Sequence, residues 1–161
     1  IGNQMRVAHA LSGAGKSTEA AQEFDACLER APIADLDVRL AAAHAKFNDG
    51  QAEQAVSLLR EIRTQNPDFR VQDVTLLSAR ALGAIGQVEP ARAQFEYLVK
   101  NFGNIEARVE YSIWLVMQQD FVRAKEMKAD IDQTVKHWNK HAKHLNKPLI
   151  KKLNDAFNGV K

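Results

Sequence analysis

The sequence predicts an all-α fold of about four helical hairpins, stacked into a right-handed superhelical solenoid and closed by a C-terminal capping helix. Ala is abundant, whereas only four prolines and eight glycines occur among 161 residues, and this composition favours helix. No window shows the alternation typical of a strand, apart from VQDVTLL, which continues with helical spacing. A set of small and large apolar residues also recurs at intervals of 35, 36 and 33 residues, as in a helical repeat.

The recurring set defines three clear units and a fainter fourth. Its members are Gly15, Ala20, Phe24 and Pro32; Gly50, Ala55, Leu59 and Pro67; Gly86, Ala91, Phe95 and Gly103; and Gln119, Ala124 and Lys128. The Gly is expected to end a first helix at positive φ. The Ala then lets two helices cross closely, and the large apolar residue four positions later shares its face. Pro or Gly ends the second helix.

This spacing predicts nine helices, at residues 3–13, 17–30, 35–48, 52–65, 72–84, 88–101, 105–118, 121–144 and 147–158. The eighth is the longest, and the ninth carries an apolar stripe of Leu149, Ile150, Leu153 and Phe157 that can cover an open end of the solenoid. We therefore divide the chain into a repeat array at 1–135 and a second part at 136–161. The array holds repeats at about 1–34, 35–70, 71–104 and 105–138, and the second part combines the basic end of the long helix with the capping helix.

The repeated pattern resembles the tetratricopeptide repeat family, whose unit is a helix–turn–helix. The resemblance covers residues 3 to about 135. It departs from the family pattern early in the first helices, where Gln4, Arg39, Thr75 and Arg108 replace the usual aromatic residue. The resemblance implies a protein-interaction scaffold rather than an enzyme, with no cofactor and with a peptide or protein segment as partner.

A narrower resemblance concerns the stretches from NPDFRVQDVTLL to VEYSIWL and HWNKHAKHLNKPLIKK. These are similar to bacterial membrane-anchored tetratricopeptide proteins, in which a short phospholipase-D-nuclease-N-terminal-like hydrophobic segment precedes the repeats. The chain begins at Ile1, without a Met and inside a helical pattern, so we expect a piece of a longer protein. The resemblance then implies membrane contact through the parent N-terminus, and a soluble domain that is cytoplasmic or membrane-anchored.

The family resemblance also implies a concave groove lined by the first helix of each pair. The expected groove residues are Met5, His9, Leu40, His44, Phe47, Leu76, Arg80, Val109, Ile113 and Val116. Apolar members would contact partner side chains, while His9, His44 and Arg80 would add polar contacts. The alternative is that some of them pack against the eighth helix or the cap. Self-association through exposed groove or end surfaces is a further alternative.

Charge is unevenly placed along the chain. Residues 1–135 hold 15 Lys and Arg against 19 Asp and Glu, whereas residues 136–161 hold seven Lys against one Asp. A basic patch is therefore expected at Lys136, Lys140, Lys143, Lys147, Lys151 and Lys152. It suggests an alternative function, an electrostatic adaptor that docks on an anionic membrane or nucleic acid. The absence of Arg from this segment disfavours nucleic acid recognition.

The stretch ALSGAGKSTEAA, residues 10–21, contains the Gly-Lys-Ser that ends a phosphate-binding P-loop. That loop needs another glycine at position 10, where this chain has Ala, and a buried strand before it. The recurrence of Gly15 as Gly50 and Gly86 indicates a turn between helices instead. We expect no nucleotide binding here.

Metal binding and catalysis are not expected either. His137, His141 and His144 would share one face of the long helix, but Lys136, Lys140 and Lys143 beside them disfavour a cation. The single cysteine, Cys27, falls in a small-residue position of the repeat, where packing is its expected role. No nucleophile stands beside a base in the pattern.

Overall fold

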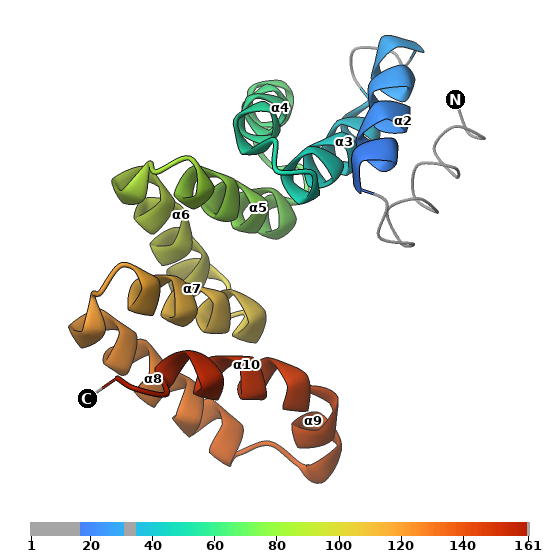
Figure 1. The fold of residues 1–161 in the computed structure, drawn as a ribbon. Helices are drawn as coiled ribbons and strands as arrows, with labels where there is room; N and C mark the ends of the chain where they lie inside the picture. The colour runs from blue at the N-terminus through green and yellow to red at the C-terminus, as the bar shows by residue number, and fades with distance from the viewer. Residues whose placement is uncertain (1–16, 31–34, 161) are drawn as a thin grey trace. The chain divides into compact units, whose positions relative to one another are not determined.

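The computed structural model describes residues 17–30 and 35–160, and the chain in these ranges forms nine helices and no strand (Figure 1). The helices are α2 (Ser17–Arg30), α3 (Leu36–Asn48), α4 (Ala52–Gln65), α5 (Val71–Ala84), α6 (Val88–Asn101), α7 (Ile105–Met117), α8 (Phe121–Lys136), α9 (Lys140–Leu145) and α10 (Lys147–Phe157). The predicted all-α fold of helical hairpins is confirmed. Within these ranges, none of the helices combines the length and the apolar character that crossing a membrane requires.

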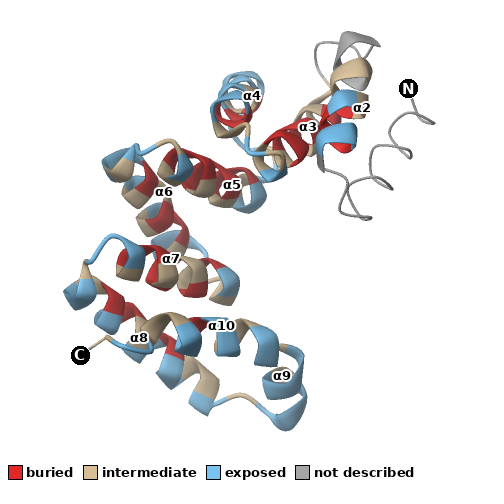
Figure 2. Cartoon of the chain, in the orientation of Figure 1, coloured by how far each residue is buried: buried red, intermediate tan, exposed pale blue. Residues whose placement is uncertain are grey.

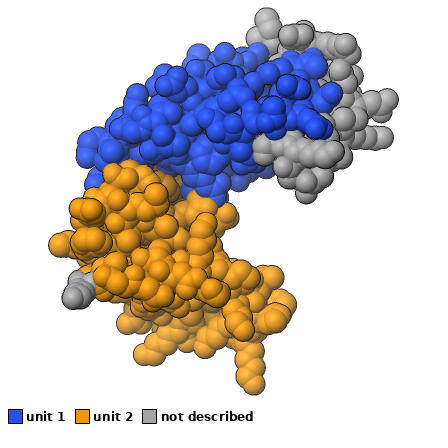
Figure 3. Space-filling model, in the orientation of Figure 1, with its two compact units in different colours: residues 1–94 blue, residues 95–161 orange. Residues whose placement is uncertain are grey.

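Most helix boundaries agree with the sequence prediction. Helices α2, α4 and α6 have the predicted bounds, and α3, α5, α7 and α10 differ by one residue at one end. The helix expected at 3–13 and the turn at Gly15 lie outside the described residues. The chain divides into two compact units, residues 1–94 and 95–161, with the boundary inside α6 (Figure 3).

Unit 1, residues 1–94, is a series of helices in which α2 packs on α3, α3 on α4, and α4 on α5. Each helix presents a buried face (Figure 2). The contact between α2 and α3 is formed by alanines and one phenylalanine, which are Ala20, Ala21, Phe24, Ala42 and Ala45. A larger cluster joins α3, α4 and α5 through Leu40, Ala43, Leu59, Ile62, Val74 and Leu77. We call this larger cluster the α3–α5 core. It lies between the two helices of the second hairpin and the first helix of the third.

The predicted alanine column is confirmed in all four repeats. Ala20, Ala55, Ala91 and Ala124 each have no exposed surface. The large apolar residue four positions later is also buried in the first three repeats, as Phe24, Leu59 and Phe95. Two helices can cross closely only where the side chain between their backbones is small.

The turns that end the first helices share one hydrogen-bond pattern. At the α3–α4 turn, the Gly50 amide donates to the Phe47 carbonyl and the Gln51 amide donates to the Lys46 carbonyl. This is the Schellman arrangement, in which the residue after the helix takes positive φ, and Gly50 has φ 79°. The same pair of bonds recurs at the α5–α6 and α7–α8 turns. The Gly of Gly-Lys-Ser occupies this repeat position in the sequence.

Unit 2, residues 95–161, is closed by α10. Helix α7 packs on α8 and on α10, and α9 contacts α10. Leu153 of α10 is fully buried in a cluster with Val109 of α7 and Ile131 of α8. In this unit α10 occupies the place that the first helix of another repeat would take, as the capping prediction requires.

The prediction of one long eighth helix at 121–144 is wrong. Helix α8 ends at Lys136, and the six-residue helix α9 begins at Lys140. Asn139 causes the break, because its side chain accepts a hydrogen bond from the Ala142 amide at 2.8 Å and so caps α9. Asn is far better at this position than inside a helix. The basic segment therefore consists of the last residue of α8, of α9 and α10, and of the turns around them.

The buried alanine column limits the size of the side chain that each of its positions can hold. Replacing Ala55 by Leu should lower the free energy of unfolding by about 1–3 kcal/mol, because the larger side chain must force α4 away from its neighbours. Chemical denaturation measures the change. Ser57→Leu is the control, since Ser57 is exposed on the same helix and should change stability by less than about 0.5 kcal/mol. Equal effects in the two variants would contradict close helix crossing at Ala55.

The α7–α8 turn predicts a stabilising substitution. Gln119 has φ 61° at the position where two earlier turns have Gly, and a side chain in this region costs about 1 kcal/mol. Gln119→Gly should raise the free energy of unfolding by about 0.5–1 kcal/mol, measured by denaturation. Gln118→Gly is the control, because Gln118 has φ −81° and a glycine there should destabilise. A loss of stability in Gln119→Gly would show that the turn carries no strain.

Candidate interaction surfaces

The ten residues expected to line a groove have different environments. Met5 and His9 lie outside the described residues. Leu40 and Val109 are buried, at 2% and 0% exposure, and belong to the hydrophobic core. Neither can contact a partner while the helices stay packed, so their assignment to a groove surface does not agree with the structure. Partly exposed positions remain at His44, Phe47, Leu76, Arg80, Ile113 and Val116.

In unit 1 the partly exposed residues come from two neighbouring helices. His44 and Phe47 lie on α3, Leu76 and Arg80 lie on α5, and these helices contact each other. On each helix the two residues are three or four positions apart, so they share a face. We call His44, Phe47, Leu76 and Arg80 the α3/α5 strip. It combines apolar side chains with an imidazole and a guanidinium.

Charged residues surround His44. Burial lowers the pKa of His44, the positive charge of Arg80 lowers it further, Asp73 opposes this, and Arg70 adds to the lowering. Arg70 in turn binds Asp73, with 2.6 Å between the nitrogen and oxygen atoms. The imidazole is therefore held toward its neutral form. A carboxylate brought next to His44 and Arg80 would find two groups able to donate hydrogen bonds.

An open pocket of about 460 Å³ adjoins the strip at the α3–α4 turn. Phe47 lines it together with Gly50, Gln51, Ala52, Glu53, Gln54, Ala84 and Ile85. Of this lining, only Phe47 was predicted from the sequence as a surface residue. The sequence spacing could have indicated Ala84 as well, because Ala84 lies four residues after Arg80 and so continues the same face of α5.

In unit 2, Ile113 of α7 packs against the core, whereas Val116 stays partly exposed. Ile113, Leu149 and Ile150 pack against the cluster formed by Val109, Ile131 and Leu153. Ile113 therefore follows the alternative in which an expected groove residue packs against the cap. Four of the six partly exposed candidates lie in unit 1, and the other two, Ile113 and Val116, lie in unit 2.

A family model for the tetratricopeptide repeat matches residues 11–75, a span that includes α2, α3, α4 and the start of α5. Over these residues the chain carries the tetratricopeptide repeat pattern. Proteins of this family generally act as non-catalytic scaffolds that bind other proteins. No curated protein matches the sequence. The narrower likeness to membrane-anchored tetratricopeptide proteins stays a prediction.

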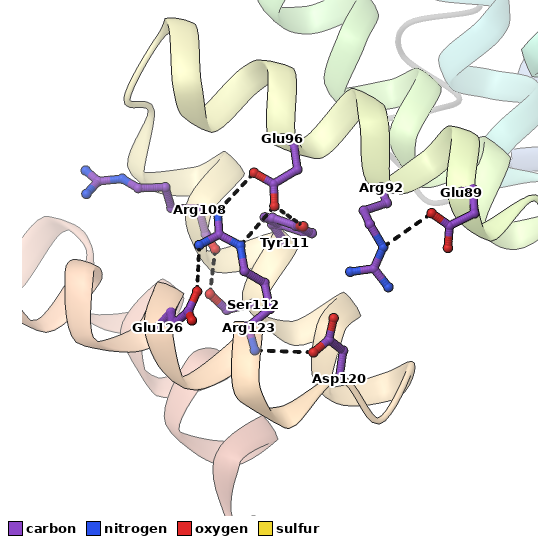
Figure 4. Close-up of polar contacts among 9 residues, drawn as sticks. All are labelled: Glu89, Arg92, Glu96, Arg108, Tyr111, Ser112, Asp120, Arg123 and Glu126. Atoms are coloured by element: carbon purple, nitrogen blue, oxygen red, sulfur yellow. Dashed lines mark hydrogen bonds and ion pairs between the residues drawn. The ribbon is translucent and has the colours of Figure 1, made fainter.

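Within the repeat protein, a polar network in unit 2 joins α6, α7 and α8 (Figure 4). Arg123 donates to both carboxylate oxygens of Glu96, each at 2.9 Å, and the Tyr111 hydroxyl donates to Glu96 at 2.5 Å. The Tyr111 ring also stacks on Phe95, with 5.1 Å between centroids. These bonds raise the pKa of Arg123, which stays charged in any case. The network fixes the fourth hairpin, and sequence spacing gave no sign of it.

The lysine side chains of the predicted basic patch, from Lys136 to Lys152, are all exposed. Lys151 is bound to Asp155 at 2.8 Å, which raises the pKa of Lys151. The helix break separates His137 from His141 and His144, so the three do not share one helix face. In the described ranges no group of three His, Cys, Asp or Glu side chains is placed to hold a metal ion. Gly15 and Lys16 of the Gly-Lys-Ser stretch lie outside the described residues, as does the side chain of Cys27.

The environment of His44 predicts a pH dependence. Because the pKa of His44 is lower in the folded chain than the value of about 6.5 it takes when unfolded, the folded state binds fewer protons. The contribution of His44 to stability is complete above pH 6.5 and is lost as the pH falls below it, until folded His44 is itself protonated. Denaturation at a series of pH values measures this loss.

In a His44→Gln variant the free energy of unfolding should change less over the same pH range. His141→Gln is the control, because His141 is exposed, and it should keep the dependence of the unaltered chain. A profile that is identical in the His44→Gln variant and the unaltered chain would contradict the prediction.

Proposed function

We propose that the chain is a protein-binding scaffold that holds a segment of its partner along the α3/α5 strip of unit 1. The single observation that supports this most is the strip itself. Its four side chains are partly exposed, although the residues around them on α3 and α5 belong to the core. A scaffold that needed only to pack would gain from burying Phe47 and Leu76 further.

The character of the strip suggests the character of the partner. Phe47 and Leu76 offer apolar contact, and the adjoining pocket of about 460 Å³ can receive a side chain. His44 and Arg80 favour an acidic group on the partner, since Arg forms strong, directional bonds with carboxylates. The proposed ligand is therefore a peptide segment that carries a large apolar residue near an Asp or Glu.

Recognition by such a surface needs no chemistry beyond complementarity. The helices are ordered by their own core before any partner arrives, so little conformational entropy is lost when a segment binds. An extended or helical segment would lie across α3 and α5 and place its apolar residue near Phe47.

A selection from a displayed peptide library, made with the full chain, tests this proposal. Peptides that are enriched should bind a Leu76→Asp, Arg80→Glu double variant at least about ten-fold more weakly, because apolar and ionic contacts are both lost. Calorimetry measures the affinities. The control is Ser57→Asp with Arg60→Glu, which makes the same change of charge at exposed sites of α4.

Circular dichroism of both double variants establishes that they stay helical. If enriched peptides bind the Leu76→Asp, Arg80→Glu variant and the α4 variant equally well, the α3/α5 strip is not the binding surface. Leu40→Asp is unsuitable for this test, because Leu40 is buried in the α3–α5 core and a charge there would unfold unit 1.

A further inference from the structure

A cleft of about 400 Å³ lies in unit 2 where α8, α9 and α10 meet. Its lining is Val135, Trp138, Lys143, Lys147, Ile150, Lys151 and Asn154. Val135 and Ile150 pack against the unit 2 core and Trp138 is half-buried, so the floor of the cleft is apolar and held in place. We call these seven residues the lysine cleft. It is distinct from the α3/α5 strip, which belongs to unit 1.

Three lysines, Lys143, Lys147 and Lys151, are among the residues that line this cleft. Lys151 already binds Asp155, whereas Lys143 and Lys147 form no ion pair with a carboxylate of the described residues. The helix break at Asn139 creates the arrangement, because a continuous helix would carry Lys143 away from α10.

We propose that the lysine cleft is a second binding site, for an acidic peptide segment that carries one large apolar side chain. The apolar side chain enters the cleft against Trp138 and Ile150, and flanking carboxylates bind Lys143 and Lys147. Charge complementarity selects the acidic residues, and the size of the cavity selects a single side chain.

The packing of α10 argues against insertion of that helix into a membrane. Insertion into a lipid surface requires an amphipathic helix that presents its apolar face outward. In α10 the residues Leu149 and Leu153 pack in the unit 2 core instead. A concave cleft between helices can receive one side chain, but it cannot enter a bilayer.

The probe is a short fluorescein-labelled peptide with one Phe between Asp and Glu residues, titrated into the full chain and followed by anisotropy. Lys143→Glu with Lys147→Glu should weaken binding at least about ten-fold, because two charge-assisted contacts become repulsive. Lys140→Glu with Lys152→Glu makes the same charge change outside the lining of the cleft, and its effect should stay below about three-fold.

A second variant blocks the cavity and keeps every lysine. Asn154 lines the cleft and is exposed, so Asn154→Phe should fill the space without disturbing the core. It should weaken binding of the Phe peptide at least about ten-fold and leave the weak binding of a matched Ala peptide unchanged. The chain has two tryptophans, Trp114 and Trp138. In a Trp114→Phe variant only Trp138 emits, and its fluorescence should respond to the Phe peptide but not to the Ala peptide.

Three results would overturn the proposal. The first is equal loss in the two lysine double variants, which would indicate a diffuse electrostatic contact. The second is unchanged Phe-peptide binding in Asn154→Phe, which would mean that no side chain enters the cleft. The third is binding of phosphatidylserine vesicles or of a single-stranded oligonucleotide with no binding of the peptide, which would assign the lysines to a membrane or to nucleic acid.

Discussion

The close crossing of helices at a buried alanine is the constraint on which the rest of the structure depends. Ala55 and its three equivalents have no exposed surface, so the helices around them approach more closely than larger residues would allow. Once this approach is fixed, the large residue four positions later is buried as well. The turn must then bring the chain back within a few residues, and the Schellman bonds at Gly50 do this.

This dependence explains why the fold could be predicted from the sequence. The alanine, the glycine of the turn and the large apolar residue act over a few positions, so their spacing records the packing directly. Even the irregular fourth repeat follows the rule. Lys128 stands where the other repeats have Phe or Leu, and its ammonium lies 5.8 Å from the centre of the Phe157 ring of α10. The capping helix supplies the aromatic contact that the repeat itself lacks.

The surface residues could be predicted less well, because exposure depends on which neighbours cover a helix. Helix α3 is buried on several sides, at Leu40, Ala42, Ala43 and Ala45, so its sequence does not mark one polar face. His44 and Leu40 are four residues apart and seemed equivalent, yet only His44 reaches the surface. The end of α8 was missed for a related reason. The lysines and histidines of 136–144 suit a helix, and the single capping bond of Asn139 outweighs them.

Helix α10 shows how one element can close a repeat array and still alter what the array can bind. By burying Leu153 against α7 and α8, it also brings Leu149 and Ile150 into the cluster that Ile113 of α7 packs against. The same packing requires the chain to reverse after Lys136, and the reversal places Trp138 and Lys143 beside α10. Covering one surface has therefore produced another of different character. A scaffold built in this way presents an imidazole–guanidinium strip in one unit and a lysine-bordered apolar cleft in the other, so both proposed sites favour acidic segments with a large apolar residue.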